Sequence, residues 1–151
     1  QYCLTDFLHP DKVDTMCFFV VTSGHEVLEY AKELKKKEEF LASHIANSIG
    51  LEAAEGFAEY LHQQIRAEWG FSDDPSWEGD DLFKLKYRSR RYSFGYPACP
   101  DLAYQKLLWD LFEPDKTIGI DLCDDYMMDP DGSVSALVMH HPDATYFRIS
   151  D

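Results

Sequence analysis

The period of the apolar positions changes several times along the chain. Met16–Thr22 is rich in β-branched and aromatic residues and is followed by Ser23 and Gly24, which predicts a buried strand that ends in a turn. Glu26–Lys37 then carries apolar residues at helical spacing, and a run of lysines and glutamates follows it. The first part of the chain therefore predicts a strand followed by an amphipathic helix.

A much longer helical pattern occupies residues 41–69. Because an apolar residue recurs at every fourth position, we expect a helix that lays this stripe against a sheet. Gly50 and Gly56 weaken the pattern by up to about 1 kcal/mol each relative to alanine, and Gly50 is a candidate for a kink or a division into two helices. The stripe consists of Leu41, Ile45, Ile49, Ala53, Phe57, Leu61, Ile65 and Trp69.

Turn-forming residues divide the second half of the chain into shorter elements. Gly70 ends the long helix, and Phe71–Asp80 has the composition of a loop. Ser93–Pro100 contains two prolines and a glycine, which predicts an irregular but fixed loop. Asp101–Leu111 predicts another helix behind an acidic N-cap candidate.

The C-terminal region predicts strands. Ile118–Leu122 indicates a short strand. Ser133–His141 and Thr145–Ile149 indicate two strands joined by the turn-forming sequence Pro142–Asp143–Ala144. Because hairpin-like strands and long helices are segregated, we expect one α+β domain with a twisted, mostly antiparallel sheet flanked by long helices, and we disfavour a doubly wound sheet.

Charge and composition narrow the classes of partner. Fourteen basic residues against twenty-eight acidic ones give a net charge of -14, which disfavours nucleic acid and anionic membrane surfaces as partners. The longest apolar runs are too short to span a bilayer. Four cysteines without close pairing indicate free thiols in a reducing cytoplasm: Cys3, Cys17, Cys99 and Cys123.

The histidines offer weak evidence for a metal site. His140 and His141 are neighbours on a predicted strand, so their side chains point to opposite faces and do not easily bind one ion. We interpret His62, together with Glu55, Glu59 and Arg66, as part of a solvated helix face with ordinary ion pairs. We therefore expect no metal ligands, and a metal-dependent hydrolase that uses His140 and His141 rests on composition alone.

The loop from Arg91 to Asp101 is the strongest candidate for a functional site. It is either a structural turn with buried aromatic residues or a ligand-binding loop. A rigid loop with a glycine lets its backbone approach a flat ligand, arginine offers a planar fork for a carboxylate, and tyrosine offers a ring with a polar tip. Such a set suits a ligand that is part carboxylate and part aromatic ring. Cys99, between Ala98 and Pro100, is expected to be a small packed side chain rather than a nucleophile.

This loop carries a resemblance to a known family. The pattern R-x-x-x-G-Y-P-A-C-P-[DE] at 91–101 resembles the signature of the S-adenosylmethionine-binding activation domain of cobalamin-dependent methionine synthases. Similar features occur in the family's order along the whole chain, at Tyr2–Phe7, Ala54–His62, Ser133–Ser135 and His141–Tyr146. The resemblance identifies residues 1–151 as the C-terminal part of that domain, incomplete at its N-terminal side. The start at Gln1 without a methionine agrees with this expectation of an incomplete piece.

The resemblance implies a function. The domain binds S-adenosylmethionine and presents its methyl group for the reductive methylation of cob(II)alamin, which reactivates the enzyme. Cobalamin is held mainly by another module of the same cytoplasmic enzyme, and flavodoxin or another reductase supplies the electron. The chain is then part of a methyltransferase, has no catalytic residue of its own and makes no methionine alone. The alternative is a non-catalytic homologue that acts as a binding or structural partner in cobalamin metabolism.

The resemblance also implies which residues contact the ligand. Arg91 matches the family's arginine and is assigned the methionine carboxylate. Ser93, Gly95 and Tyr96 match loop positions that lie along the ligand, and Ser93 replaces a frequent alanine. The family's further aspartate from the first half of the domain has no counterpart here. Three other residues complete the expected set: Tyr146 and Phe147, near the sulfonium, and Glu55, which acts on an amino or hydroxyl group.

Overall fold

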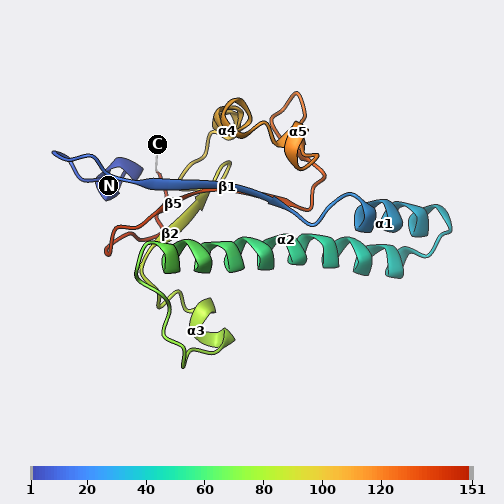
Figure 1. Ribbon diagram of the computed structural model, residues 1–151. Helices are drawn as coiled ribbons and strands as arrows, with labels where there is room; N and C mark the ends of the chain where they lie inside the picture. The colour runs from blue at the N-terminus through green and yellow to red at the C-terminus, as the bar shows by residue number, and fades with distance from the viewer. Residues whose placement is uncertain (1, 150–151) are drawn as a thin grey trace. The chain divides into compact units, whose positions relative to one another are not determined.

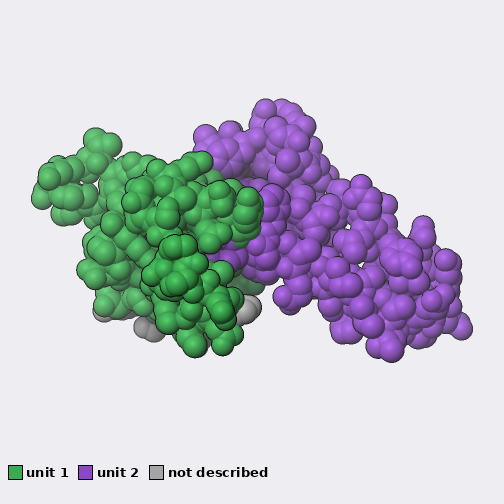
Figure 2. Space-filling model, turned by 60° about the horizontal axis from the view of Figure 1, so that its bottom comes forward, with its two compact units in different colours: residues 1–19, 60–101, 136–151 green, residues 20–59, 102–135 purple. Residues whose placement is uncertain are grey.

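The computed structural model describes residues 2–149, and the chain forms two compact units. Unit 1 comprises residues 1–19, 60–101 and 136–151, and unit 2 comprises residues 20–59 and 102–135 (Figure 2). Strands β1 and β5 and helix α2, defined below, contribute residues to both units. Both units therefore combine helices with strands, which confirms the predicted α+β class.

The main sheet has three strands, with β5 (Ser133–Met139) between β1 (Met16–Thr22) and β2 (Arg90–Ser93) (Figure 1). Strand β2 pairs antiparallel with β5, so that Arg91 lies opposite Val138 and Ser93 opposite Ala136. All residues of β5 after Ser133 are buried, as expected for the apolar run of a central strand. Strand β2 is at an edge of this sheet.

In unit 2, helix α1 (Glu26–Lys36) and the first half of α2 (Phe40–Glu68) form an antiparallel helical hairpin (Figure 1). The Ser43 hydroxyl donates a hydrogen bond of 2.7 Å to the carbonyl of Ala31. Helix α2 is continuous, so the kink or division considered at Gly50 does not occur. A Cβ atom at Gly50 would lie 2.9 Å from Cγ1 of Val27, which shows that the glycine permits the close approach of α1.

The predicted buried face of α2 is wrong over the first part of the helix; of the predicted stripe, Ile65 is buried and Leu61 and Trp69 are half-buried. Leu41, Ile45 and Ile49 are 75%, 50% and 58% exposed, and Phe57 is exposed as well. Most of the buried positions lie one residue further along the helix and also recur every fourth residue: Ala46, Gly50, Ala54, Ala58, His62 and Arg66. Small side chains allow neighbouring elements to pack close to the helix axis, so the largest apolar side chains did not mark its inner face.

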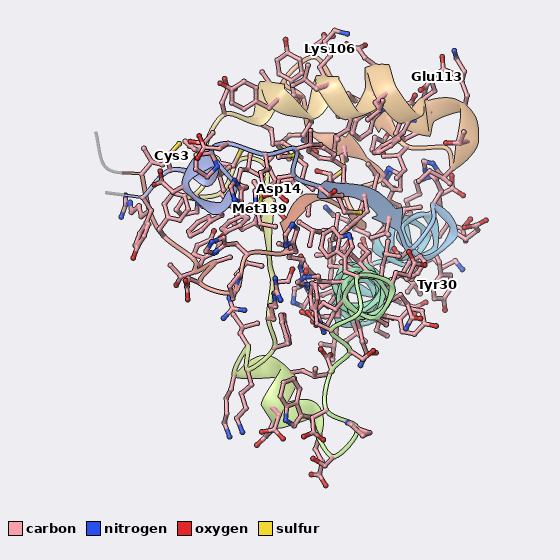
Figure 3. The ribbon with its side chains drawn as sticks, turned by 60° about the vertical axis from the view of Figure 1, so that its left-hand side comes forward. Cys3, Asp14, Tyr30, Lys106, Glu113 and Met139 are labelled. Atoms are coloured by element: carbon pink, nitrogen blue, oxygen red, sulfur yellow. The ribbon has the colours of Figure 1, made fainter. Side chains whose placement is uncertain are left out.

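Unit 2 also contains a group of short elements that hydrogen bonds hold together. The indole Nε1 of Trp109 donates to the carbonyl of Ile120 at 2.9 Å. The amide of Gln105, which is 1% exposed, donates to the carbonyl of Tyr126 at 2.7 Å and accepts from the Ser135 hydroxyl. The elements are η2 (Leu102–Tyr104), α4 (Gln105–Phe112), α5 (Pro114–Thr117), β3 (Asp121–Leu122) and β4 (Met128–Asp129). Lys106 and Glu113 mark the two ends of α4 in Figure 3.

Several boundaries differ from the sequence prediction. The helix expected at Asp101–Leu111 begins as the short 3-10 turn η2, and the strand expected at Ile118–Leu122 is reduced to β3. The strand expected at Thr145–Ile149 is wrong, because this segment has no strand pairing within the described residues. Its backbone instead bonds to a side chain and to a loop, as described below. The remaining elements, η1 (Leu4–Phe7), α3 (Gly79–Phe83), β2, α5 and β4, were not predicted.

No helix within residues 2–149 combines the length and the apolar character needed to cross a membrane.

Candidate functional site

The candidate loop begins inside strand β2. Tyr92 is 0% exposed, whereas Arg91 and Ser93 are half-buried. Because successive side chains of a strand point to opposite faces, Arg91 and Ser93 share one face and Tyr92 points to the other. The first loop residues are therefore positioned by the ladder with β5.

Beyond Ser93 the loop is irregular and fixed, as predicted. Gly95 has a φ of +79°, a conformation that glycine adopts without strain. Its N–H donates to the Cys99 carbonyl at 2.8 Å, and the Cys99 N–H donates to the Tyr96 carbonyl at 2.8 Å. Phe94, Ala98 and Cys99 are buried, and Tyr96 is 56% exposed. The loop thus anchors itself through buried side chains and presents Gly95 and Tyr96 outward.

Cys99 is a packed side chain, as predicted from the sequence. It is 7% exposed, and its burial raises the pKa of its thiol. A raised pKa keeps the sulfur in the thiol form, which is a poor nucleophile.

The C-terminal segment 145–149, called the closing segment below, contacts this loop. The N–H of Ile149 donates to the Pro97 carbonyl at 3.0 Å. The ring of Tyr146 stacks on Tyr92 with a centroid distance of 6.1 Å, and the Phe147 ring lies 6.0 Å from Tyr92. Burial, with a smaller contribution from Tyr96, raises the pKa of the Tyr146 hydroxyl. The structure therefore brings Tyr146 and Phe147 to the loop that contains Tyr96, although the two regions are about fifty residues apart in sequence.

A buried polar network supports the start of β2. The Ser89 hydroxyl donates to the Met139 carbonyl at 2.7 Å, and His62 Nε2 lies 3.0 Å from the Ser89 oxygen. Since the Ser89 proton is already donated, His62 must donate from Nε2, which leaves Nδ1 as the bare nitrogen. Burial, followed by the charges of Arg66, Arg91 and Arg90, lowers the pKa of His62 to about 3. The imidazole is therefore neutral at physiological pH.

The prediction that His62 and Arg66 belong to a solvated face is wrong, because both side chains are 0% exposed. Arg66 binds Asp73 through two hydrogen bonds, and its guanidinium carbon lies 3.6 Å from the centre of the Tyr87 ring. The sequence carried a signal for this network. His62 and Arg66 continue the four-residue repeat of the buried small residues of α2, a face that was passed over for the larger apolar side chains.

The two adjacent histidines have separate partners. His140 Nε2 lies 2.7 Å from Oδ1 of Asp14. Backbone hydrogen bonds from His9 and Thr15, then the bond with His140, lower the pKa of Asp14 to about 2. His141 Nδ1 accepts a hydrogen bond from the Asp143 N–H at 3.2 Å. No group of three histidine, cysteine or acidic side chains placed to hold a metal ion occurs within residues 2–149.

The remaining expected site residue, Glu55, belongs to a different compact unit from the others. It is an exposed residue of α2 and belongs to unit 2, whereas the other six belong to unit 1. Its role in ligand binding stays a prediction.

The fold and the site together define an α+β domain that offers a fixed loop, the edge of a sheet and exposed aromatic rings as a binding surface. A family model described as the vitamin B12-dependent methionine synthase activation domain matches residues 1–151. This chain therefore belongs to the family of vitamin B12-dependent methionine synthase activation domains.

Curated relatives and a solved structure agree with this assignment. The chain is 35% identical to methionine synthase of Mycobacterium tuberculosis (strain ATCC 25618 / H37Rv) and 34% identical to that of Mycobacterium leprae (strain TN), in each case over 97% of its length. It spans 13% of the length of either relative. The crystal structure of the MetH reactivation domain bound to AdoHcy superposes with a TM-score of 0.91 at 32% identity, covering 97% of this chain and 46% of that one.

Proposed function

We propose that this chain binds S-adenosylmethionine and presents its methyl group for the reductive methylation of cob(II)alamin in a methionine synthase. The observation that carries this proposal is the contact between the loop at 91–101, called the signature loop below, and the closing segment. Ile149 bonds to Pro97, and Tyr146 stacks on Tyr92. The solved relative is bound to AdoHcy, which is S-adenosylmethionine without the transferred methyl group. The contact supports a site for the same adenosyl ligand.

The residues of the loop and the closing segment fit the parts of this ligand. The guanidinium of Arg91 suits the carboxylate as a two-bond partner. The ring of Tyr146, which is 48% exposed, offers a face that attracts a sulfonium by about 0.5 to 2 kcal/mol, and Phe147 adds apolar area beside it. Gly95 and Tyr96 lie along the remainder of the ligand.

The edge of β2 explains how one ligand can touch both sets of residues. Arg91 and Ser93 share the face opposite Tyr92, whose ring stacks on Tyr146. A ligand that binds Arg91 and Tyr146 together therefore crosses the edge of β2. Backbone N–H and C=O groups at a strand edge can bond a flat ring, which is the role we assign to the backbone of Ser93.

In this proposal the chain orients the methyl donor and provides no acid, base or nucleophile. Cobalamin, held mainly by another module of the enzyme, supplies the cobalt that accepts the methyl group, and flavodoxin or another reductase supplies the electron. Orientation of a bound donor toward a bound acceptor is itself a large contribution to rate. The free thiols of the chain support a cytoplasmic location.

Titration calorimetry of the folded chain with S-adenosylmethionine tests the binding site. We expect saturable binding, and we expect Arg91→Ala to weaken it by about 10- to 100-fold, the range for a hydrogen-bonded charge. Lys84→Ala is the matched control, because Lys84 is an exposed cation of the same basic segment and should bind the ligand normally. Absence of saturable binding would favour the alternative, a non-catalytic homologue.

The exposed face of α2 supports the further proposal that the chain works inside a longer enzyme. Leu41, Ile45 and Ile49 form this α2 apolar face, a line of exposed large apolar side chains spaced four residues apart. More than half of the solved reactivation domain lies outside the match with this chain. We assign the α2 apolar face to packing against that remaining part of the domain.

Cysteine accessibility tests this assignment. With the native cysteines replaced by serine, because Cys3 and Cys123 are exposed thiols, a cysteine introduced at Ile45 should react rapidly with a maleimide in the 151-residue chain and at least tenfold more slowly in the longer methionine synthase polypeptide. A cysteine at Glu33, an exposed residue of α1, is the control and should react rapidly in both. Equal rates at Ile45 in the two proteins, or a dimer of the short chain that protects Ile45, would contradict the assignment.

A further inference from the structure

Tyr92 occupies the centre of an aromatic cluster, and the binding proposal assigns it no contact with the ligand. Its side chain is completely buried, so it cannot touch a ligand. Its ring stacks on Phe7 at 6.2 Å with an angle of 9° between the planes, and on Tyr146 at 6.1 Å with an angle of 16°. Phe147 is tilted against it at 6.0 Å. Both aromatic residues of the closing segment therefore rest on Tyr92.

The hydroxyl of Tyr92 provides a second link to the same segment. It donates a hydrogen bond of 2.7 Å to the Thr145 carbonyl. Burial raises the pKa of this hydroxyl to about 12, so it remains a donor throughout the physiological range. Tyr92 thus holds the backbone at Thr145 and the ring of the next residue, Tyr146.

The closing segment depends on such links because no strand ladder holds it. Thr145–Ile149 has no strand pairing within the described residues. Beyond the turn, where the Ala144 N–H donates to the His141 carbonyl at 3.1 Å, its backbone is bonded by the Tyr92 hydroxyl and, at the far end, by the Pro97 carbonyl. Between these two points lie Tyr146 and Phe147. Tyr92 therefore helps to set both positions: it contacts Tyr146 and Phe147, and Phe147 also lies 6.0 Å from Phe7 and from Tyr2.

We propose that Tyr92 is a positioning residue for the adenosyl ligand: it fixes Tyr146 beside the signature loop without contacting the ligand itself. The inference rests on the proposed binding of S-adenosylmethionine. In this proposal the two faces of β2 have different roles. Arg91 and Ser93 contact the ligand on one face, and Tyr92 holds the closing segment on the other.

Tyr92→Phe is the sharpest test, because it keeps the stacked ring and removes only the hydrogen bond to Thr145. We expect the Kd for S-adenosylmethionine to rise about 3- to 10-fold, the effect of one hydrogen bond. In the ligand-free chain, amide hydrogen exchange should accelerate at 145–149 and stay unchanged in β5. This second measurement reports the closing segment independently of any ligand.

Tyr87→Phe is the matched control, because Tyr87 is another buried tyrosine of unit 1 and stacks under Arg66 rather than on the closing segment. It should alter neither the Kd nor exchange at 145–149, even where it lowers the free energy of unfolding as much as Tyr92→Phe does. A Kd within twofold of the wild type for Tyr92→Phe would overturn the positioning role, whether or not exchange accelerates. No binding by the wild-type chain would instead refute the proposed function.

Discussion

Arg66 and Asp73 form an ion pair from which solvent is excluded. Nε of Arg66 lies 2.6 Å from Oδ1 of Asp73 and Nη2 lies 2.5 Å from Oδ2, and the two side chains are 0% and 6% exposed. Helix α2 supplies the arginine and the loop after it supplies the aspartate. The pair therefore fixes the path of the chain from the end of α2 toward β2 and the candidate site.

Removing one partner of this pair should be strongly destabilising. Asp73→Ala leaves a buried guanidinium without its counter-charge, which we expect to lower the free energy of unfolding by about 3 to 5 kcal/mol. Urea unfolding monitored by circular dichroism measures the loss. Asp110→Ala is the control, because Asp110 pairs with Lys106 on the exposed surface of α4 and should cost no more than about 1 kcal/mol. Equal losses in the two variants would mean that the buried pair contributes nothing special.

Protonation of His62 should destabilise the chain in acid. Its pKa is about 3 when folded against 6.5 for an exposed histidine, so the unfolded chain takes up a proton at a higher pH than the folded chain does. The stability that comes from the neutral imidazole is present above pH 6.5 and is lost as pH falls toward 3, by up to about 1.4 kcal/mol per pH unit. His62→Gln should flatten the dependence of the unfolding free energy on pH in this window. His44→Gln, at an exposed position of α2, should leave the slope unchanged; the idea fails if the two variants behave alike.

The spacing of apolar residues was enough to predict the type and the bounds of the first strand and the first helix. Met16–Thr22 forms β1 with the predicted bounds, and α1 ends one residue before the predicted Lys37. The existence of α2 was also predictable, but its inner face was not. Two four-residue repeats run side by side on this helix, and apolar size favoured the wrong one. The repeat of alanine and glycine is buried because neighbouring elements pack close to the helix.

The candidate site was predictable where the loop sequence restricts its own backbone. Two prolines, a glycine and buried small residues fix the loop after Ser93, and Cys99 packs as expected. The closing segment was assigned wrongly as a strand, because the bond from Tyr92 to Thr145 joins residues 53 positions apart. The burial of His62 and Arg66 had a signal in the four-residue repeat of α2, but their partners had none. A pattern along one helix does not reveal a partner such as Ser89 or Asp73.

Gly95→Ala should separate local backbone strain from ligand binding. An alanine at a φ of +79° costs about 1 to 2 kcal/mol, and it also places a methyl group on the surface where we expect the ligand to lie. Gly70→Ala is the matched control, because Gly70 has a φ of +85° and open space around it. Both variants should lose similar stability in thermal unfolding, and only Gly95→Ala should also weaken S-adenosylmethionine in calorimetry. A normal affinity for Gly95→Ala would exclude the loop backbone from the site.

The two glycines of α2 should respond in opposite directions to the same substitution. At Gly56 an added methyl group meets nothing within 4 Å, so Gly56→Ala should raise the free energy of unfolding by about 0.5 to 1 kcal/mol through helix propensity alone. At Gly50 the methyl group would lie 2.9 Å from Cγ1 of Val27 and 3.1 Å from Cδ2 of Leu28. Because the χ1 angle of a valine in a helix has one strongly preferred value, Val27 cannot rotate out of the way, and helix α1 must move instead. We expect a net loss of about 1 to 3 kcal/mol from overpacking, measured by urea unfolding of both variants. A gain in stability at both positions would show that Gly50 is tolerated rather than required by the packing of α1 on α2.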